Sequence, residues 1–223
     1  MFTSELSSSP IRESYETMRH QSSRLLFDYW DSLRGGRIAP ERCDVDPVEL
    51  KSILADVFFA ERTTGDFLMF QFVGTRINAM HGFDLQHRSA LGIWSGTSAG
   101  DFVKMIERMT AHGVPMVISS EGELSSKEIT EIETMILPLQ YGSRFSRFVG
   151  THVNLGKPQA FWDGRLSVCD IRSVRPLFSD RTTTDIEIGD NAQTSNVFAN
   201  VIPLAKAYGG RRIGHLTVID GGE

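Results

Sequence analysis

Two glutamates in the middle of the chain have the spacing of a facing carboxylate pair. In VISSEGELSSKEITEIETM, two strand-like runs flank a Ser-rich turn at 124–128, and antiparallel pairing across this turn sets Glu121 opposite Glu131. Like charges that face each other destabilise a sheet, and paired carboxylates can gather a hard cation. The segment has no Asp-rich loop, however, and Lys127 lies close by. We therefore prefer a solvated hairpin and predict no metal site.

Histidines are the other candidates for metal or cofactor chemistry. The chain has six of them, at His20, His81, His87, His112, His152 and His215. The two cysteines, Cys43 and Cys169, lie far apart without a Cys-x-x-Cys partner, so the sequence indicates neither a zinc site nor a disulfide. An isolated histidine is more often a surface or hydrogen-bonded residue than a ligand. The sequence assigns no cofactor.

The segment FVGTRINAMHG places Thr75 and Arg76 between a strand-like run and a helical one. A phosphate-binding loop at such a place needs several glycines, so that backbone N–H groups can face the anion. This segment supplies Gly74 at the turn, and we interpret Thr75 as a cap and Arg76 as a solvated side chain. No Ser lies in a Gly-x-Ser-x-Gly pattern, and the absence of nucleophile motifs favours a binding module.

Composition limits the class of protein. The chain has 223 residues, of which 40% are hydrophobic and 23% charged, and this suits one domain with an appendage. No apolar run approaches the roughly 18 residues of a membrane helix, and the N-terminus lacks the pattern of a secretory signal. A net charge of -5 gives no field that attracts nucleic acid. We expect a cytoplasmic protein that binds neither nucleic acid nor membrane.

Periodicity divides the chain into four parts. Residues 1–13 read as a disordered leader, and 14–36 as an N-terminal helix that ends at two glycines. Residues 37–156 contain a hairpin, a short helix after Gly74, a longer helix ending at Gly113 and three further strands. A short helix is also expected from Asp46. Residues 157–223 have little apolar patterning and are interpreted as a partly disordered C-terminal tail.

The tetrapeptide FVGT occurs twice, at 72–75 and 148–151. The first copy leaves a strand for a helix, whereas the second lies inside a strand, and the flanking residues differ. An internal repeat shows self-similarity along its whole period, so we reject a duplicated domain.

Over about residues 25–155 the sequence resembles a PAS domain, and more narrowly a family of small single-domain bacterial PAS-like proteins. The residues that carry the resemblance are Tyr29-Trp30, Leu33-Arg34-Gly35-Gly36, Asp46-Pro47, Phe72-Val73-Gly74-Thr75 with Gly82, and Leu137-Pro138-Leu139. His87 departs from the family pattern, because a glycine is expected there. The resemblance implies an α+β fold, namely a PAS-like five-stranded antiparallel sheet with helices on one face, an N-terminal helix and a C-terminal tail.

A PAS fold places a small ligand between the sheet and the helices. The residues expected to line this ligand pocket are Met69, Phe70, Phe72, Met80, Trp94, Phe102, Met105, Met109, Ile118 and Ile136. The same residues also fit a plain apolar core. Some PAS domains hold haem through a helical histidine. His81 and His87 are the candidates by position in this chain, but we predict no haem. Flavin-binding PAS photosensors carry their reactive cysteine in the central helices. Cys43 lies before the strands, away from those helices, so we expect no flavin photochemistry.

The resulting prediction is a non-enzymatic PAS-type sensory or regulatory module that binds a small ligand or a signalling partner. The alternatives are a small divalent-metal-assisted enzyme that uses Glu121 and Glu131, and an interaction scaffold without a ligand. We also expect a homodimer through the N-terminal helix, because its apolar stripe is wide and PAS domains commonly pair through such helices. The residues predicted at this interface are Tyr15, Met18, Leu25, Leu26, Tyr29 and Trp30.

Overall fold

The structure of the protein is a computed structural model. It describes residues 17–63, 68–156, 158 and 164–177, and the backbone of residues 212–213 and 216–217. The predicted leader, 1–13, lies outside the described residues. Residues 1–186 and 187–223 form separate units, and in the second unit β7 (Arg212–Ile213) pairs with β8 (Leu216–Thr217).

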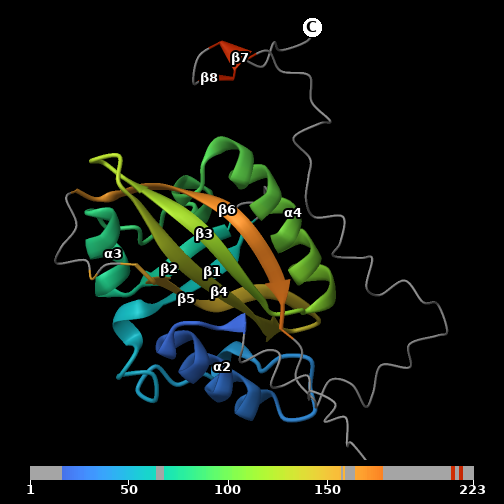
Figure 1. The fold of residues 1–223 in the computed structure, drawn as a ribbon. Helices are drawn as coiled ribbons and strands as arrows, with labels where there is room; N and C mark the ends of the chain where they lie inside the picture. The colour runs from blue at the N-terminus through green and yellow to red at the C-terminus, as the bar shows by residue number, and fades with distance from the viewer. Residues whose placement is uncertain are drawn as a thin grey trace, which may run out of the picture. The chain divides into compact units, whose positions relative to one another are not determined.

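The first unit is built on an antiparallel sheet with the strand order β2-β1-β5-β4-β3-β6 (Figure 1). Its strands are β1 (Val57–Arg62), β2 (Leu68–Val73), β3 (Met116–Leu124), β4 (Ile129–Tyr141), β5 (Arg144–Asn154) and β6 (Leu166–Pro176). The predicted α+β, PAS-like fold is confirmed. The sheet has six strands rather than five, because β6, from the segment interpreted as a tail, pairs along β3.

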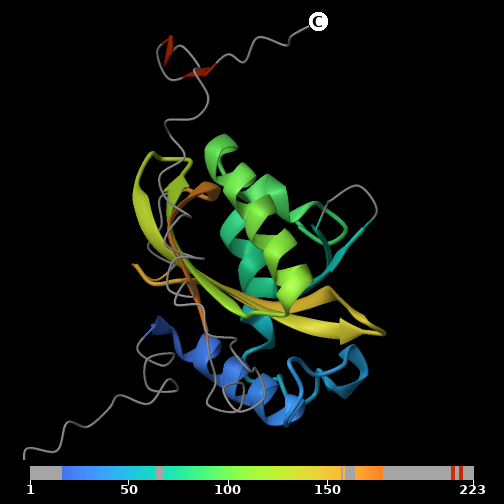
Figure 2. The same ribbon diagram turned by 90° about the vertical axis from the view of Figure 1, so that its right-hand side faces the viewer.

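Helices cover both faces of the sheet (Figure 2). The predicted N-terminal helix, α2 (Gln21–Arg34), lies on one face, and α4 (Gly96–His112) lies on the other. The face that α4 covers also carries α3 (Thr75–His81) and the 3-10 turn η3 (Ala90–Ile93). Gly35 and Gly113 follow α2 and α4 with positive φ angles of 57° and 67°, as expected for glycines that end helices.

Residues 41–56 connect α2 to the sheet through short turns. Two 3-10 turns, η1 (Arg42–Asp44) and η2 (Leu54–Asp56), bracket the segment where we expected a helix from Asp46. In that segment backbone N–H groups donate to carbonyls three residues earlier, as Glu49 does to Asp46. These bonds form turns, so the expected helix is absent. A segment this short gains little from helix formation, because nucleation is costly.

The two FVGT copies lie on either side of β1. Phe58 pairs with Val73 in β2 and with Gly150 in β5. The first copy ends β2 at Gly74 and begins α3, and the second continues within β5, as predicted. A Cβ at either glycine would lie within 2.3 Å of a backbone oxygen, of Ala55 for Gly74 and of Met135 for Gly150. These close approaches explain why both copies carry glycine.

Alternation along the strands divides the core into two layers. Under α2, an apolar cluster joins Phe27 and Trp30 to Leu137 and Val149, and the Trp30 Nε1–H donates to the Pro138 carbonyl at 2.8 Å. The intervening residues of the strands point to the opposite face, which α3, η3 and α4 cover. That second layer contains the interior cavity described next.

Candidate functional site

The interior cavity lies between the sheet and α4, where a PAS fold is expected to hold a ligand. It has a volume of about 10 Å³, and every residue that lines it is buried. Four of the ten predicted pocket residues line it, namely Phe70, Trp94, Phe102 and Ile136. The Trp94 and Phe102 rings are in contact, with centroids 5.1 Å apart.

Thr134 and His152 are the polar residues of the cavity lining. The Oγ1 atom of Thr134 lies 2.8 Å from Nδ1 of His152, and both residues are buried. Neither was predicted as a pocket residue. The signal that identifies them is strand alternation, which sets Thr134 on the face of Ile136 and pairs Thr134 with His152 across β4 and β5.

His152 meets a second buried histidine, His81 of α3. Their Nε2 atoms are 3.4 Å apart, whereas the ring centroids are 5.4 Å apart, so the rings meet at their Nε2 corners. Burial lowers the pKa of His81 to about 4, against the effect of a hydrogen bond with the Leu166 backbone. Burial, and then the neighbouring His81, lower the pKa of His152 well below its ordinary value. Both rings are therefore neutral at pH 7, and no charged side chain among the described residues lines the cavity.

Trp94 has a buried donor without a partner. Its Nε1–H makes no hydrogen bond with the described residues, although Trp94 is only 4% exposed. Buried polar groups are paired in the great majority of cases, and an unpaired one needs an explanation such as a bound water or ligand. This orphan donor belongs to a residue that lines the cavity.

The other predicted pocket residues lie elsewhere. Met105, Met109 and Ile118 are buried but do not line the cavity. Phe72 packs against the cluster under α2, on the opposite face of the sheet. Met69 is only half-buried in β2. Met80 lines a different cavity, beside the start of α2.

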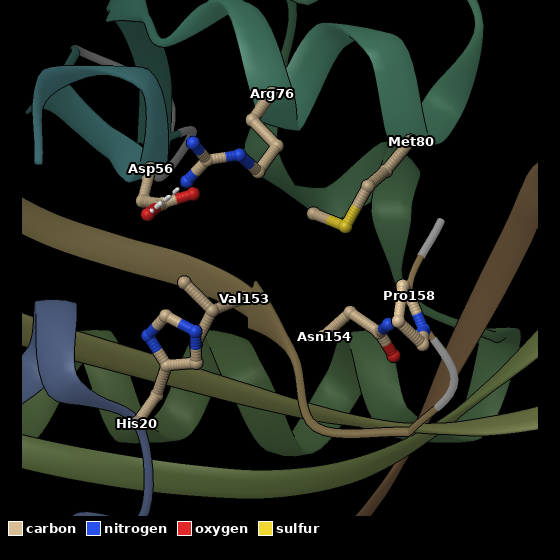
Figure 3. A pocket seen from close by; sticks show the side chains of 7 residues that line it. All are labelled: His20, Asp56, Arg76, Met80, Val153, Asn154 and Pro158. Carbon is tan, nitrogen blue, oxygen red and sulfur yellow. Dashed lines mark hydrogen bonds and ion pairs between the residues drawn. The ribbon is translucent and has the colours of Figure 1, made fainter. Parts of the chain in front are cut away.

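That second cavity, the lateral cleft, opens on the surface between the N-terminus of α2, η2, α3 and the end of β5 (Figure 3). It has a volume of about 350 Å³. Its lining consists of His20, Asp56, Arg76, Met80, Val153, Asn154 and Pro158. Figure 3 shows Arg76 and Met80 on one side of the cleft and His20 with Val153 on the other. Sequence reasoning interpreted Arg76 as a solvated side chain and did not bring His20 or Asp56 to it.

The predicted register of the glutamate hairpin is confirmed, because Glu121 pairs with Glu131. Each carboxylate has its own arginine, since Glu121 accepts from Arg172 of β6 and Glu131 from Arg19 at 2.5 Å. Among the described residues no group of three or more His, Cys, Asp or Glu side chains could hold a metal ion. The arginines remove the excess charge that would attract a cation.

The structure also shows the surroundings of the residues considered for haem or thiol chemistry. His81 faces His152, and His87 is exposed with a positive φ of 62°. This φ favours glycine, which is the residue that the family pattern expects at His87. Both cysteines are free, and burial raises the pKa of the Cys169 thiol to about 12.

The predicted dimer interface is largely inside the protomer. Met18, Leu26 and Trp30 belong to the cluster between α2 and the sheet, whereas Leu25 is 42% exposed and Tyr29 is half-buried. Tyr15 lies outside the described residues. Dimerisation through α2 stays a prediction, and Leu25 and Tyr29 are the predicted residues that a second copy can reach.

Within the described part of the chain, no helix has both the length and the apolar character that crossing a membrane requires.

Comparison with known proteins gives one family and several distant structures. A sequence model of the PAS domain matches residues 18–153. Comparison with curated proteins gives no match. Among solved structures, the chain is similar to the LOV domain of an Erythrobacter litoralis blue-light activated histidine kinase, with 15% identity, a TM-score of 0.36, and coverage of 46% of this chain and 96% of that one. It is also similar to the PAS domain of an HTR-like protein from Haloarcula marismortui, with 15% identity, a TM-score of 0.37, and coverage of 49% and 91%. A Rhodobacter sphaeroides LOV protein has 11% identity, a TM-score of 0.39, and coverage of 52% and 72%.

Proposed function

Because the chain belongs to the PAS domain family, a family of sensory and regulatory modules, we propose that its interior cavity binds a small, largely apolar ligand that accepts a hydrogen bond from Trp94. The ligand lies between the sheet and α4, in contact with Phe70, Phe102 and Ile136. The protein acts as a binding module rather than as an enzyme.

The observation that carries this proposal is the unpaired indole N–H of Trp94. Leaving a buried donor unpaired costs about 1–3 kcal/mol, and a ligand acceptor that reaches this N–H from the cavity removes that cost on binding. Thr134 and the neutral His152 also line this cavity, where their polar atoms bond each other. An apolar pocket with a few convergent polar groups is the usual form of a small-molecule site.

The size of the cavity limits the ligand. A volume of about 10 Å³ is close to the roughly 10–15 Å³ that one water requires. Any larger ligand must displace lining side chains, and the contacting rings of Trp94 and Phe102 are among the largest of them. Trp94 follows η3 and Phe102 belongs to α4, so this displacement would shift both elements. Such a coupling between occupancy and helix position suits a sensor.

The alternative of a metal-assisted enzyme is less well supported. It requires Glu121 and Glu131 to be available to a cation, and both are ion-paired with arginines. The interior cavity does not favour an enzyme either. The Oγ1 of Thr134 already bonds His152, and the other side chains that line the cavity are apolar.

The test compares two Trp→Phe variants by native mass spectrometry of protein purified from its own host. Trp94→Phe removes the orphan donor, so it should retain at least about fivefold less ligand, the equivalent of about 1 kcal/mol. Trp30→Phe is the matched control, because it removes an indole N–H that is paired with Pro138 on the opposite face. It should lower the melting temperature and leave ligand retention unchanged. Equal retention in both variants, or no bound ligand in the wild type, would overturn the proposal.

A further inference from the structure

Arg76 is held in a fixed position at the lateral cleft. Its Nη1 donates to Oδ2 of Asp56 at 2.5 Å, and the hydroxyl of Ser22 donates to the same oxygen at 2.7 Å. The Asp56 side chain is 3% exposed, whereas that of Arg76 is 57% exposed. A buried carboxylate thus orients a guanidinium whose remaining N–H groups have no partner among the described residues.

His20 presents a second donor across the cleft. Its Nδ1 accepts the Ser22 N–H at 3.1 Å, as the N-cap of α2. A neutral imidazole that accepts at Nδ1 carries its proton at Nε2, so Nε2 is a donor. Within the described chain Nε2 has no hydrogen-bond partner, and Figure 3 shows the ring turned toward the cleft.

The rest of the cleft offers apolar contacts. Met80 extends its thioether toward the centre of the cleft, and Val153 lies opposite (Figure 3). The volume of about 350 Å³ lies at the lower end of the range of small-molecule sites, about 300–1,000 Å³. Two donors beside an apolar wall fit a ligand with an anionic end and an apolar body.

We infer that the lateral cleft binds a small aliphatic or aromatic carboxylate, with its carboxylate on Arg76 and His20 and its apolar body on Met80 and Val153. The planar guanidinium offers parallel N–H groups that match a carboxylate, and charge-assisted hydrogen bonds of this kind are the strong ones. The site is separate from the interior cavity. It lies between the N-cap of α2 and α3, so an occupant contacts both His20 and α3.

The test measures binding by NMR titration of the full chain. Hexanoate is the probe, and 1-hexanol and sulfate are the comparison solutes. Hexanoate should shift the amide signals of residues around Arg76 and His20 in a saturable way. Arg76→Lys keeps the ion pair with Asp56 but loses the planar fork, and it should weaken hexanoate binding at least about fivefold. His20→Asn keeps an N-cap acceptor but removes the Nε2 donor, and it should weaken binding about fivefold.

Arg172→Lys is the matched control. The Arg172 side chain is 59% exposed and ion-paired with Glu121, so it resembles Arg76 in exposure and pairing but lies on β6. It should leave hexanoate binding unchanged, as should Trp94→Phe, which separates this inference from the interior ligand. The inference is wrong if 1-hexanol binds as tightly as hexanoate, if sulfate binds equally well, or if Arg76→Lys and Arg172→Lys behave alike. Thermal melting of each variant confirms that it folds.

Discussion

The buried pair of His81 and His152 makes the stability of the protein depend on pH. In the folded state the pKa of His81 is lowered to about 4, whereas in the unfolded chain it is about 6.5. The unfolded state therefore binds the proton first, so the free energy of unfolding falls as the pH is lowered from about 6.5 to 4, by on the order of 3 kcal/mol for this group. His152 acts in the same direction. Above pH 6.5 this contribution is constant.

The variant His81→Gln tests this dependence. Glutamine keeps a donor and an acceptor but does not titrate, so urea unfolding between pH 6.5 and 4 should show a shallower loss of stability than in the wild type. An unchanged slope would show that the pKa of His81 is not lowered in the folded state, or that other groups dominate acid unfolding.

The sequence indicated the environment of some individual residues but not of others. His87 was noted only as a departure from the family pattern, which expects glycine there, and its φ of 62° is one that favours glycine. Arg76 was interpreted from its place after Gly74 as a solvated side chain, whereas in the structure it is ion-paired with Asp56. Its surroundings were not predicted, because Asp56 of η2 meets Arg76 of α3 only in the folded chain, and His20 lines the same cleft only when α2 docks on the sheet. A contact between residues far apart in the chain leaves no local pattern.

At the scale of elements, α2 is fixed to the sheet by a buried polar cluster as well as by apolar packing. The carboxylate of Glu133 accepts from the Arg19 and His20 backbone N–H groups and from the Ser23 hydroxyl at 2.7 Å. The Oγ of Ser23 also lies 2.9 Å from Oγ1 of Thr151. Ser23, Glu133 and Thr151 are all buried, so each bond replaces one that water would otherwise supply.

Ser23→Ala should lower the free energy of unfolding by about 1–3 kcal/mol, because it removes a donor from a buried carboxylate. Ser32→Ala is the matched control in the same helix. Ser32 is exposed and its hydroxyl donates to the Tyr29 carbonyl of the same helix, so its loss should change stability by less than about 0.5 kcal/mol. Urea unfolding gives both values, and hydrogen exchange of the α2 amides should accelerate in Ser23→Ala alone. Similar effects of the two substitutions would contradict a specific role of the cluster in docking α2.

Elements with strong periodicity, or with glycines or a turn at their ends, were predicted well. Gly35 and Gly113 gave the ends of α2 and α4, and the turn at 124–128 gave the register of Glu121 with Glu131. Strand β6 was missed because it lies at the edge of the sheet. Of its side chains only Leu166 and Cys169 are fully buried, so it has no regular alternation of apolar residues.

At the scale of the whole molecule, β6 raises the question of where the folded unit ends. The family match ends at 153 and the predicted domain ends at 156, yet β6 pairs with the whole length of β3, from Met116 to Leu124. The backbone of Cys169 accepts from the Ser95 N–H, and the Oγ of Ser98 accepts from the Ile171 N–H. Through these bonds β6 also positions the start of α4, which covers the interior cavity.

A chain that ends at residue 156 should therefore be much less stable than one that ends at 186. Removing β6 exposes the edge of β3 and loses the buried side chains of Leu166, Cys169 and Leu177, each of which contributes about 1–3 kcal/mol. Since 1 kcal/mol shifts the melting temperature of a domain this size by about 2–4 °C, we expect a loss of at least about 10 °C or failure to fold. The chain 1–186, which forms one unit by itself, should melt within a few degrees of the full chain. If 1–156 melts as the full chain does, β6 is dispensable, and the folded domain ends where the family match ends.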